Sequence, residues 1–311
     1  MDARELSFCS GGTEACSLAL LGAGRRLRPG ARLVTWAAEH QAVLGPLRQL
    51  ELEGWPLAVL SVDPGGRADP GAIPAGTALV SISLANNEVG TLQPVAEVAA
   101  RAREVGALVH LDACQGVQWL RPPLELADLT SFSGHKIGAG SGGLLHVRSG
   151  LLLEPLQYGG PQEFGRRPGR ENLGAAVAVA TALGTCFARR EERARAVSPL
   201  TARLQALLLE LGGRPTGAEP RLPNLASAAF AGVRGEDLLL ALDLAGVSAS
   251  SGSACASGSL DPSHVLLALG LSLEESLGSL RLSLGYGSTD AEVERALPIL
   301  RQALLPVVAH A

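Results

Sequence analysis

The stretch Leu129-Thr130-Ser131-Phe132-Ser133-Gly134-His135-Lys136 decides the fold, because a strand pattern there ends in a group of polar side chains. Lys136 is the only lysine of the chain, which has 311 residues, and the other 25 of its 26 basic residues are arginines. A lysine amine can lose its proton and condense with an aldehyde, which a guanidinium group cannot do. Lys136 is therefore either a Schiff-base lysine or the chance survivor of an arginine-rich composition.

Short apolar runs on both sides of this stretch alternate with helical patterns, which is typical of a parallel sheet with crossover helices. We expect an α/β fold with a large domain over residues 1–195 and a smaller α/β domain over residues 196–311. The sequence predicts strands at 32–36, 56–62, 77–84, 107–112, 129–133, 143–147, 224–231 and 280–284. It predicts helices at 15–21, 42–54, 94–106, 173–211, 235–245 and 290–305.

Composition excludes several classes of protein. The net charge of −4 and the pI near 5.9 argue against direct binding of nucleic acid. The sequence contains no run of 18 or more apolar residues, so it predicts no membrane span. Its first residues also lack the pattern of a signal peptide. The five cysteines form no CxxC pair and no zinc-type spacing. We therefore expect free thiols, a cytoplasmic location and no resident metal.

The segment Phe8-Cys9-Ser10-Gly11-Gly12-Thr13-Glu14 runs from a strand end into a predicted helix. Small residues at a helix start leave backbone N–H groups free, and the helix dipole there attracts an anion. Gly12 and Thr13 therefore either bind a phosphate or form a tight turn with a helix cap.

Asp112 follows a buried strand, at the edge of the sheet where open α/β folds bind ligands. It is either the partner of a protonated pyridine nitrogen or the cap of the next helix. In an extended chain, Ser133 and His135 would point one way, toward a phosphate, and Lys136 the other way.

Two further polar groups follow predicted strands. His40 lies after the strand at 32–36 and is placed to stack on a planar cofactor. Asn87 lies after the strand at 77–84 and can supply an amide to a ring oxygen. We expect these groups to meet at the carboxyl edge of one sheet.

Cys255 differs from the other cysteines in its surroundings. Cys9, Cys16 and Cys186 have the apolar neighbours of buried cysteines, whereas Cys255 lies among Ser, Gly and Ala without apolar periodicity. An exposed thiol in such a segment suits the transfer of sulfur between sites. Its thiolate is the nucleophile, and His40 is the candidate to promote its deprotonation.

The sequence resembles the cysteine desulfurases of the NifS/IscS type, which are pyridoxal 5'-phosphate (PLP) enzymes of the class V aminotransferase group. The resemblance runs from about Phe8 to the C-terminus and rests on the segments SGGTEA, AEHQAVL, LANNEVGTLQP, LDACQG, SFSGHKIGAGSGG and SSGSACASGSLDPS. It implies the type I fold of PLP-dependent transferases. It also implies a homodimer that takes L-cysteine as substrate and passes sulfur to an iron-sulfur scaffold protein or a tRNA-thiolation acceptor.

The resemblance also implies a role for each site residue. Lys136 would bind the cofactor and relay the α-proton, Asp112 would pair with the pyridine nitrogen, and His40 would stack on the ring. Cys255 would carry the persulfide and contact a transferred iron-sulfur cluster. Gln115 and Asn87 would hydrogen-bond the ring hydroxyl, and Arg281, with Asn87 nearby, would bind the substrate carboxylate. The phosphate would be bound by Gly12, Thr13, Ser133, Gly134 and His135.

The sequence departs from the family pattern in two main places. Family members carry a segment ahead of the position of Phe8, with an Asp-x-Ala-Ala-Thr-Thr-Pro motif that is not present here. Arg170 stands where the family tends to have a threonine that reaches the phosphate in the neighbouring subunit, so it either contacts that phosphate or faces solvent. Two alternatives to a cysteine desulfurase stay open. The protein is either a non-catalytic, truncated homologue that acts as a dimeric binding partner, or a lyase for selenocysteine or cysteine sulfinate.

Overall fold

The structure is a computed structural model that describes residues 2–252 and 262–309. The chain divides into two compact units. Unit 1 comprises Met1–Ser61, Ala68–Asn86 and Gln93–Arg190, and unit 2 comprises Val62–Arg67, Asn87–Leu92 and Glu191–Ala311. Within the described part of the chain, no helix has the length and apolar character needed to cross a membrane.

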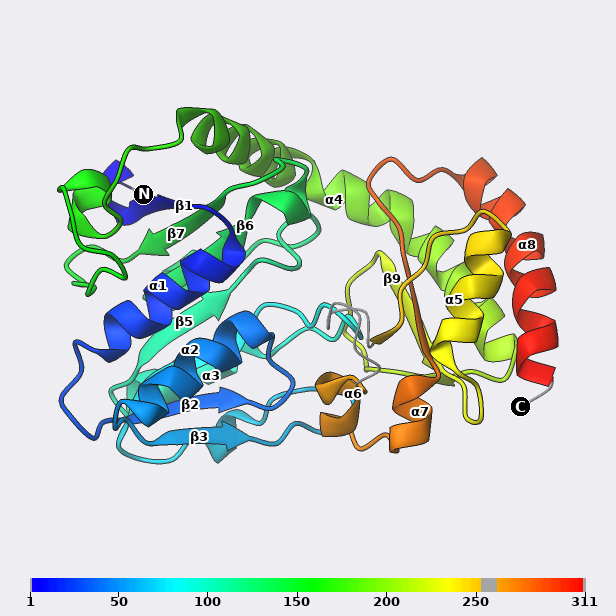
Figure 1. The fold of residues 1–311 in the computed structure, drawn as a ribbon, viewed down its shortest axis with the longest axis horizontal. Coiled ribbons are helices and arrows are strands. Elements are labelled where there is room, and N and C mark those ends of the chain that lie inside the picture. Colours follow the sequence, from blue (N-terminus) through cyan, green and yellow to red (C-terminus); the bar gives the residue numbers. More distant parts are fainter. Residues whose placement is uncertain (1, 253–261, 310–311) are drawn as a thin grey trace. The chain divides into compact units, whose positions relative to one another are not determined.

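Unit 1 is built on a seven-stranded sheet with the order β1-β7-β6-β5-β4-β2-β3 (Figure 1). Strands β6, β5, β4, β2 and β3 are parallel, whereas β7 pairs antiparallel with both β1 and β6. Two strands that are each antiparallel to β7 run in the same direction, so β1 and β6 end at the same edge of the sheet. The strands are β1 (Leu6–Cys9), β2 (Arg32–Trp36), β3 (Leu57–Leu60), β4 (Thr77–Ser83), β5 (Leu108–Asp112), β6 (Leu129–Ser133) and β7 (Gly143–Val147).

Helices cover this sheet and bury its apolar side chains. Helix α1 (Gly12–Gly24) packs against β6 and β7, and α2 (Gln41–Leu52) packs beside α1 (Figure 1). The two helices approach closely, since a Cβ atom on Gly24 would lie 2.4 Å from Leu50 Cδ1. Helix α3 (Val95–Glu104) packs against β4 and β5. The α1–α2 core therefore fixes the loops that follow β1 and β2.

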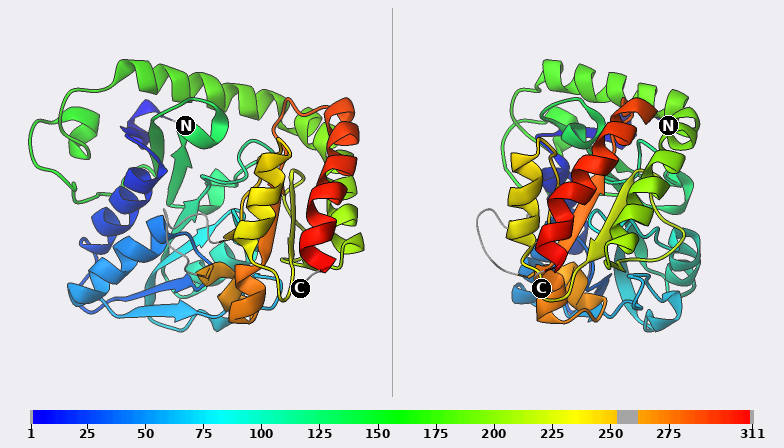
Figure 2. Two further views of the ribbon diagram at one scale, coloured as in Figure 1. Left: turned by 45° about the vertical axis from the view of Figure 1, so that its right-hand side comes forward. Right: turned by 90° about the vertical axis from the view of Figure 1, so that its right-hand side faces the viewer.

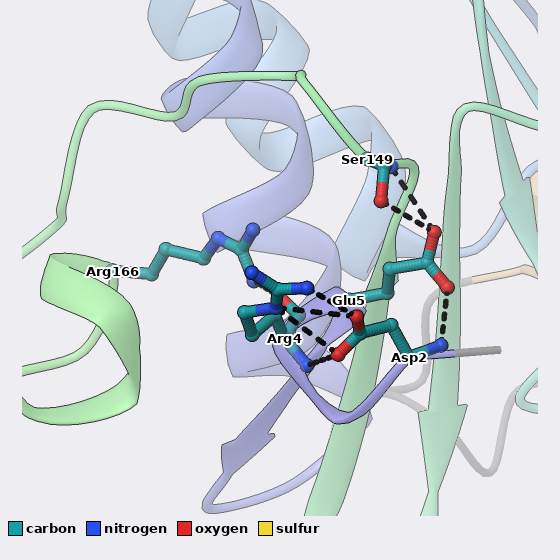
Figure 3. Close-up of polar contacts among 5 residues, drawn as sticks. All are labelled: Asp2, Arg4, Glu5, Ser149 and Arg166. Carbon is teal, nitrogen blue, oxygen red and sulfur yellow. Dashed lines mark hydrogen bonds and ion pairs between the residues drawn. The ribbon is translucent and has the colours of Figure 1, made fainter.

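The start of unit 1 is tied to the far end of β7 by polar contacts (Figure 3). Asp2 caps the short 3-10 helix η1 (Ala3–Glu5), and the Glu5 carboxylate accepts hydrogen bonds from Asp2 N at 2.8 Å and Ser149 Oγ at 2.9 Å. Arg166 Nη1 donates to the carbonyl oxygen of Arg4 at 2.9 Å. These contacts hold β1 in register beside β7.

Unit 2 contains a three-stranded antiparallel sheet with the order β10-β9-β8. Helices α5 and α8 lie side by side in this unit (Figure 2). Its buried core joins α5, α8, β9, β10 and the last part of α4. The elements are α4 (Leu173–Glu210), which begins in unit 1, β8 (Arg214–Pro215), β9 (Leu225–Ala229), α5 (Gly235–Leu244), α6 (His264–Ala268), α7 (Leu273–Leu277), β10 (Ser279–Ser283) and α8 (Asp290–Ala309).

The predicted strands and helices are confirmed to within a few residues at most ends, but one local prediction was wrong. Residues 134–137 form a 3-10 helix, η4 (Gly134–Ile137), in place of the extended chain predicted from Ser133 to Lys136. The turn closes because Gly138 adopts φ +81°, a left-handed conformation that favours glycine, and its N–H bonds the Gly134 carbonyl.

Candidate active site

The buried carboxylate of Asp112 lies at the centre of the carboxyl edge of the sheet. Asp112 ends β5 and is 6% exposed. Its Oδ1 accepts a hydrogen bond from Cys114 N at 2.9 Å, so it organises the turn that follows, although no helix begins there. Across the described residues, Asp112 has no ion-pair partner. A buried carboxylate in this situation is stabilised by a cationic N–H donor.

Gly12 begins helix α1 next to β6. A Cβ atom on Gly12 would lie 2.9 Å from the Ser133 Cβ and 3.2 Å from the Ser133 Oγ. The first backbone N–H groups of a helix have no partner within the helix, and those of α1 begin at Gly12. Thr13, in the same turn, is exposed. The structure thus brings together Gly12, Thr13 and Ser133, three of the predicted phosphate ligands.

The 3-10 helix η4 presents His135 and Lys136 on the surface of unit 1. Ser133 Oγ lies 2.8 Å from His135 Nδ1, and the Lys136 carbonyl accepts a hydrogen bond from Gln118 Nε2. Partial burial, together with the positive charges of Lys136 and His40, lowers the pKa of His135. His135 is therefore neutral near pH 7 and can donate one hydrogen bond without adding charge.

His40 is the N-cap residue of α2. Its Nδ1 accepts a hydrogen bond from Ala42 N at 3.0 Å, so a ring hydrogen is on the other nitrogen, Nε2. The charge of His40 acts on His135, so the loops after β2 and β6 approach one another. The structure therefore brings His40 near the segment of Lys136.

Glu39, next to His40, is a buried residue of this edge that the sequence motifs did not single out. Burial, with the negative charge of Asp112 as a further contribution, raises the pKa of Glu39 to about 8. Its Oε1 accepts hydrogen bonds from Ser83 N at 3.0 Å and Ser83 Oγ at 3.1 Å. Glu39 is therefore mostly protonated at pH 7. The strand-end position of Glu39, beside His40, was the available signal.

For three other predicted site residues, the structure gives only the burial or a backbone hydrogen bond. Gln115, in the turn after Asp112, is partly buried. Gly134 lies at the start of η4, where its N–H donates to the Gly142 carbonyl at 2.7 Å. Arg170 is exposed.

A small cavity of about 130 Å³ lies beside the end of β1 in unit 1. It is lined by backbone and side chains of the β1 end, the Ser141–Gly143 turn and the segment from Glu163 to Ala176. Glu163 accepts a hydrogen bond from Phe8 N at 3.1 Å, and Arg167 donates to Glu14 at 3.0 Å. These contacts involve two of its charged side chains, and Glu171 is a third that lines it.

Asn87 and Arg281 belong to unit 2, where they contact one another. Arg281, on β10, donates from Nη1 to the Asn87 carbonyl oxygen at 2.9 Å. The Nε atom of Arg281 is buried and has no hydrogen-bond partner in the described part of the chain. A buried guanidinium N–H without a partner is costly, and a carboxylate would satisfy it with its two oxygens.

Cys255 lies outside the described residues, but the residues on either side of its segment are described. Gly252 N donates to Ser279 Oγ at 2.9 Å. Ser263 caps α6 and donates a hydrogen bond to the buried carboxylate of Glu88. Burial raises the pKa of Glu88, and the Ser263 hydrogen bond opposes this shift. Ser279 and Glu88 therefore hold Gly252 and Ser263, which are described residues on the two sides of that segment.

The comparisons with known proteins agree with this arrangement. The family model "Aminotransferase class-V" matches residues 1–296. A cysteine desulfurase of Gluconacetobacter diazotrophicus is 42% identical over 309 residues, which cover 95% of this chain and 77% of that protein. A cysteine desulfurase IscS of Methanosarcina thermophila is 40% identical over 95% of this chain and 76% of its own length.

Solved structures give the same result. A NIFS-like protein superposes with a TM-score of 0.89 at 30% identity, over 98% of this chain and 83% of that one. DndA from Streptomyces lividans superposes with a TM-score of 0.76 at 35% identity, over 90% of this chain and 82% of its own. On the strength of this agreement in sequence and fold, the chain belongs to the class V aminotransferase family and, within it, to the cysteine desulfurases.

Proposed function

We propose that the protein is a PLP-dependent cysteine desulfurase that converts L-cysteine to L-alanine and holds the sulfur as a persulfide on Cys255. The observation that carries this proposal is the buried carboxylate of Asp112, which has no ion-pair partner in the described chain and lies at the same sheet edge as η4 with Lys136. A pyridine nitrogen that carries a proton fits this carboxylate, and the nearby amine fits its aldehyde.

The residues of unit 1 fit the remaining groups of PLP. Gly12, Thr13 and Ser133, with His135, would bind the phosphate through helix N–H groups and side-chain donors, and Gly134 would line the site, since its own N–H donates to the Gly142 carbonyl. Gln115, together with Asn87 of unit 2, would hydrogen-bond the ring hydroxyl, and His40 would stack on the ring. When bound, the cofactor supplies an electron-withdrawing ring that stabilises negative charge at the substrate α-carbon.

The protein's own side chains would perform the remaining tasks. Arg281 would hold the substrate carboxylate, because its Nε is buried without a hydrogen-bond partner among the described residues and its fork matches two oxygens. Lys136 would carry the α-proton between atoms of the substrate. To take the thiol proton of Cys255, His40 would have to release the hydrogen bond from Ala42 N at its Nδ1, because Nε2 already carries a hydrogen. The Cys255 thiolate would then attack the substrate sulfur: the S–S bond forms as the Cβ–S bond of the substrate breaks, and the carbon left behind takes up a proton to become alanine.

We further propose that the enzyme is a cytoplasmic homodimer that passes sulfur to an iron-sulfur scaffold or another acceptor. Apolar side chains exposed on unit 1 support the dimer, since an interface would cover apolar surface of this kind. They are Leu152, Tyr158, Phe164, Leu173 and Val177, each at least 59% exposed. Arg170, exposed in the same stretch, would reach the partner's phosphate. We keep the division into domains at residues 1–195 and 196–311 as part of the proposal.

The test is the release of sulfide and alanine from L-cysteine by the purified protein with PLP. We expect Cys255→Ser to abolish turnover and Cys186→Ser, a buried cysteine in α4, to retain it. Borohydride reduction followed by peptide mapping should place the cofactor on Lys136. Release of sulfide by Cys255→Ser at the wild-type rate, or a label on another residue, would overturn the proposal. Parallel rates on selenocysteine and cysteine sulfinate identify the preferred substrate.

A further inference from the structure

The first turns of helix α1 and the turn after strand β5 bring two thiols and a carboxylate together. Cys16 lies on α1, Asp112 ends β5, and Cys114 follows Asp112 by two residues. The sulfur atoms of Cys16 and Cys114 and a carboxylate oxygen of Asp112 all lie within 4.8 Å of one another. Within residues 2–252 and 262–309, no other cysteine, histidine, aspartate and glutamate side chains form such a group.

Packing holds the two sulfur atoms in this position. Cys16 is fully buried in the core that joins α1 and α2, and Cys114 packs against the same core. A Cβ atom on Gly12 would lie 2.7 Å from the Cys114 sulfur, so this sulfur fits because residue 12 has no side chain. Side chains in a close-packed interior keep well-defined positions. The pair of thiols is therefore a fixed feature of unit 1.

The carboxylate of Asp112 is held by the backbone of the same turn. Its Oδ1 accepts a hydrogen bond from Cys114 N at 2.9 Å, and the residue is buried. None of the ion pairs in the described part of the chain includes Asp112. Hydrogen bonds to a carboxylate ligand orient it in metal sites. Asp112 therefore offers an oriented oxygen and an uncompensated negative charge to a cation.

A buried histidine on the same strand has other partners. His110 Nδ1 lies 2.8 Å from Ser81 Oγ on β4, and His110 Nε2 lies 2.9 Å from Ser131 Oγ on β6. All three side chains are fully buried. Both nitrogens of the His110 ring are thus occupied by hydroxyl groups. The ligand set next to this strand therefore consists of two sulfurs and one carboxylate oxygen.

This ligand set suits a divalent cation that prefers sulfur. Zn²⁺ and its chemical analogue Cd²⁺ bind thiolates, whereas Mg²⁺ and Ca²⁺ bind oxygen ligands. Tetrahedral Zn²⁺ ligands of these types lie about 3.7 Å apart, so the three ligand atoms would approach by about 1 Å at most. Cys114 is partly exposed, which gives the ion a path to the site and leaves a fourth position for water.

We propose that Cys16, Cys114 and Asp112 form a binding site for Zn²⁺ or a similar sulfur-preferring cation in the protein without cofactor. The ligands come from two separate elements, and for this reason the cysteine spacing shows no zinc-type motif. One consequence rests on the proposed function: the ion occupies the carboxylate that would pair with the pyridine nitrogen. The cation and PLP then exclude one another, so the ion controls how much of the protein accepts its cofactor.

Binding of the ion must displace two protons. The nearby Cys16 thiol, burial and the charge of Asp112 raise the pKa of the Cys114 thiol well above its usual value. The nearby Cys114 thiol lowers the pKa of Cys16, but burial and the charge of Asp112 raise it overall. Both thiols are therefore protonated near neutral pH, and a thiolate is the form that binds metal. Each displaced proton makes the affinity rise about tenfold per pH unit, so two protons make it rise about a hundredfold.

The first test titrates the full chain without cofactor with Cd²⁺ and measures the thiolate-to-cadmium absorbance band. All proteins carry Cys255→Ser, so that the Cys255 thiol contributes no signal. We expect one Cd²⁺ per chain. Cys16→Ser and Cys114→Ser should each bind about a hundredfold more weakly, since one ligand of four is lost. Cys186→Ser, a substitution of a buried cysteine in α4, is the matched control and should bind as tightly as its parent.

Two further measurements do not depend on substitution of the thiols. Asp112→Asn keeps both sulfurs, so it should weaken Cd²⁺ binding and leave the intensity of the band at saturation unchanged. In the parent protein, the dissociation constant for Cd²⁺ should fall about a hundredfold per pH unit near pH 7. Equal affinities of Cys16→Ser and Cys186→Ser, or a fall of only about tenfold per pH unit, would overturn the site.

The second test measures the affinity for PLP by absorbance titration with and without Zn²⁺. At a free Zn²⁺ concentration about ten times its own Kd, the apparent Kd for PLP should rise about tenfold. Cys16→Ser is the control for direct binding of Zn²⁺ to PLP in solution, and its affinity for PLP should not respond to the ion. Equal responses of Cys16→Ser and its parent would refute the competition. A protein that binds no PLP even without Zn²⁺ would refute the proposed function, whereas the Cd²⁺ titration decides the ion site by itself.

Discussion

Gly12 and Ser133 are in direct contact across the junction of α1 and β6, and this contact leaves no room for a side chain at residue 12. A Cβ atom there would lie 2.9 Å from the Ser133 Cβ and 2.7 Å from the Cys114 Sγ. Real Cβ atoms do not approach other heavy atoms so closely, so any larger residue must displace the end of β6 or the turn after Asp112. The phosphate-binding and nitrogen-binding ends of the proposed site are thus packed on one another.

We expect Gly12→Ala to lower the free energy of unfolding by about 1–3 kcal/mol, the usual cost of overpacking. The displaced Ser133 should also weaken PLP binding. Gly11→Ala is the matched control, because a Cβ atom on Gly11 meets nothing within 4 Å and its backbone is extended. Urea denaturation and PLP titration of both variants test this. Equal effects of the two substitutions would contradict the packing argument.

Substitution of Arg281 by lysine keeps the charge and removes the fork. We expect Arg281→Lys to raise the KM for L-cysteine about ten- to a hundredfold, which corresponds to the loss of one charged hydrogen bond, with a smaller effect on kcat. Arg214→Lys is the control, since the exposed Arg214 makes an ion pair with the partly buried Glu275 in the same unit. Steady-state kinetics on both variants measures whether the KM for L-cysteine rises only in Arg281→Lys. An unchanged KM in Arg281→Lys would remove Arg281 from the substrate site.

The two serine caps of α6 and α7 offer a separate test of the Cys255 segment. Ser263 caps α6 directly after that segment and contacts Glu88, whereas Ser272 caps α7. Replacement of either serine by alanine should cost about 0.5–2 kcal/mol of stability. Only Ser263→Ala should also slow persulfide formation, with PLP binding unchanged, because Glu88 no longer holds the end of the segment. Single-turnover alkylation of Cys255 measures this rate, and equal slowing in Ser272→Ala would count against the argument.

Glu39 and His110 give opposite pH dependences of stability. The folded pKa of Glu39, about 8, exceeds its ordinary value of 4.5, so folding takes up a proton between these values and stability falls as pH rises. The folded pKa of His110, about 4, lies below its ordinary value of 6.5, so stability falls as pH drops from 6.5 to 4. The two effects offset one another between pH 4.5 and 6.5, and only that of Glu39 remains between pH 6.5 and 8.

We therefore expect Glu39→Gln to gain stability relative to wild type as pH rises from 6.5 to 8, by at most about 1.4 kcal/mol per pH unit. The conservative amide keeps the hydrogen bond to Ser83 and removes the titration. Denaturant unfolding at pH 6.5, at about pH 7 and at pH 8 would measure it. A constant difference between the two proteins over this range would show that Glu39 does not titrate there.

Much of the fold could be predicted from the sequence because its strands and helices carry strong local signals. Strands such as Thr77–Ser83 are apolar runs closed by polar residues, and α3 begins after proline and is followed by Gly106. The chain at residues 134–137 was predicted wrongly because its 3-10 turn depends on a left-handed Gly138, and glycine is compatible with many conformations.

The candidate site was predictable only where its residues follow strands. Asp112, Lys136 and His40 do so, and their positions on parallel strands are enough to bring them to one edge. Cys16 and Cys114 could not be linked from the sequence, because their contact depends on the rotation of α1 against the sheet. Cys16 was expected in the core, and it is fully buried, but nothing in the sequence indicated that its sulfur lies within 4.8 Å of the Cys114 sulfur.

The complete burial of Ser81, His110 and Ser131 has a consequence for isotope exchange. Hydrogens on their side chains reach solvent only when the strands that carry them separate. After transfer into deuterium oxide, the persistence of the proton on the His110 ring would therefore time the opening of the sheet. The exchange rate of this one ring proton would therefore measure how often the unit opens transiently from its folded state.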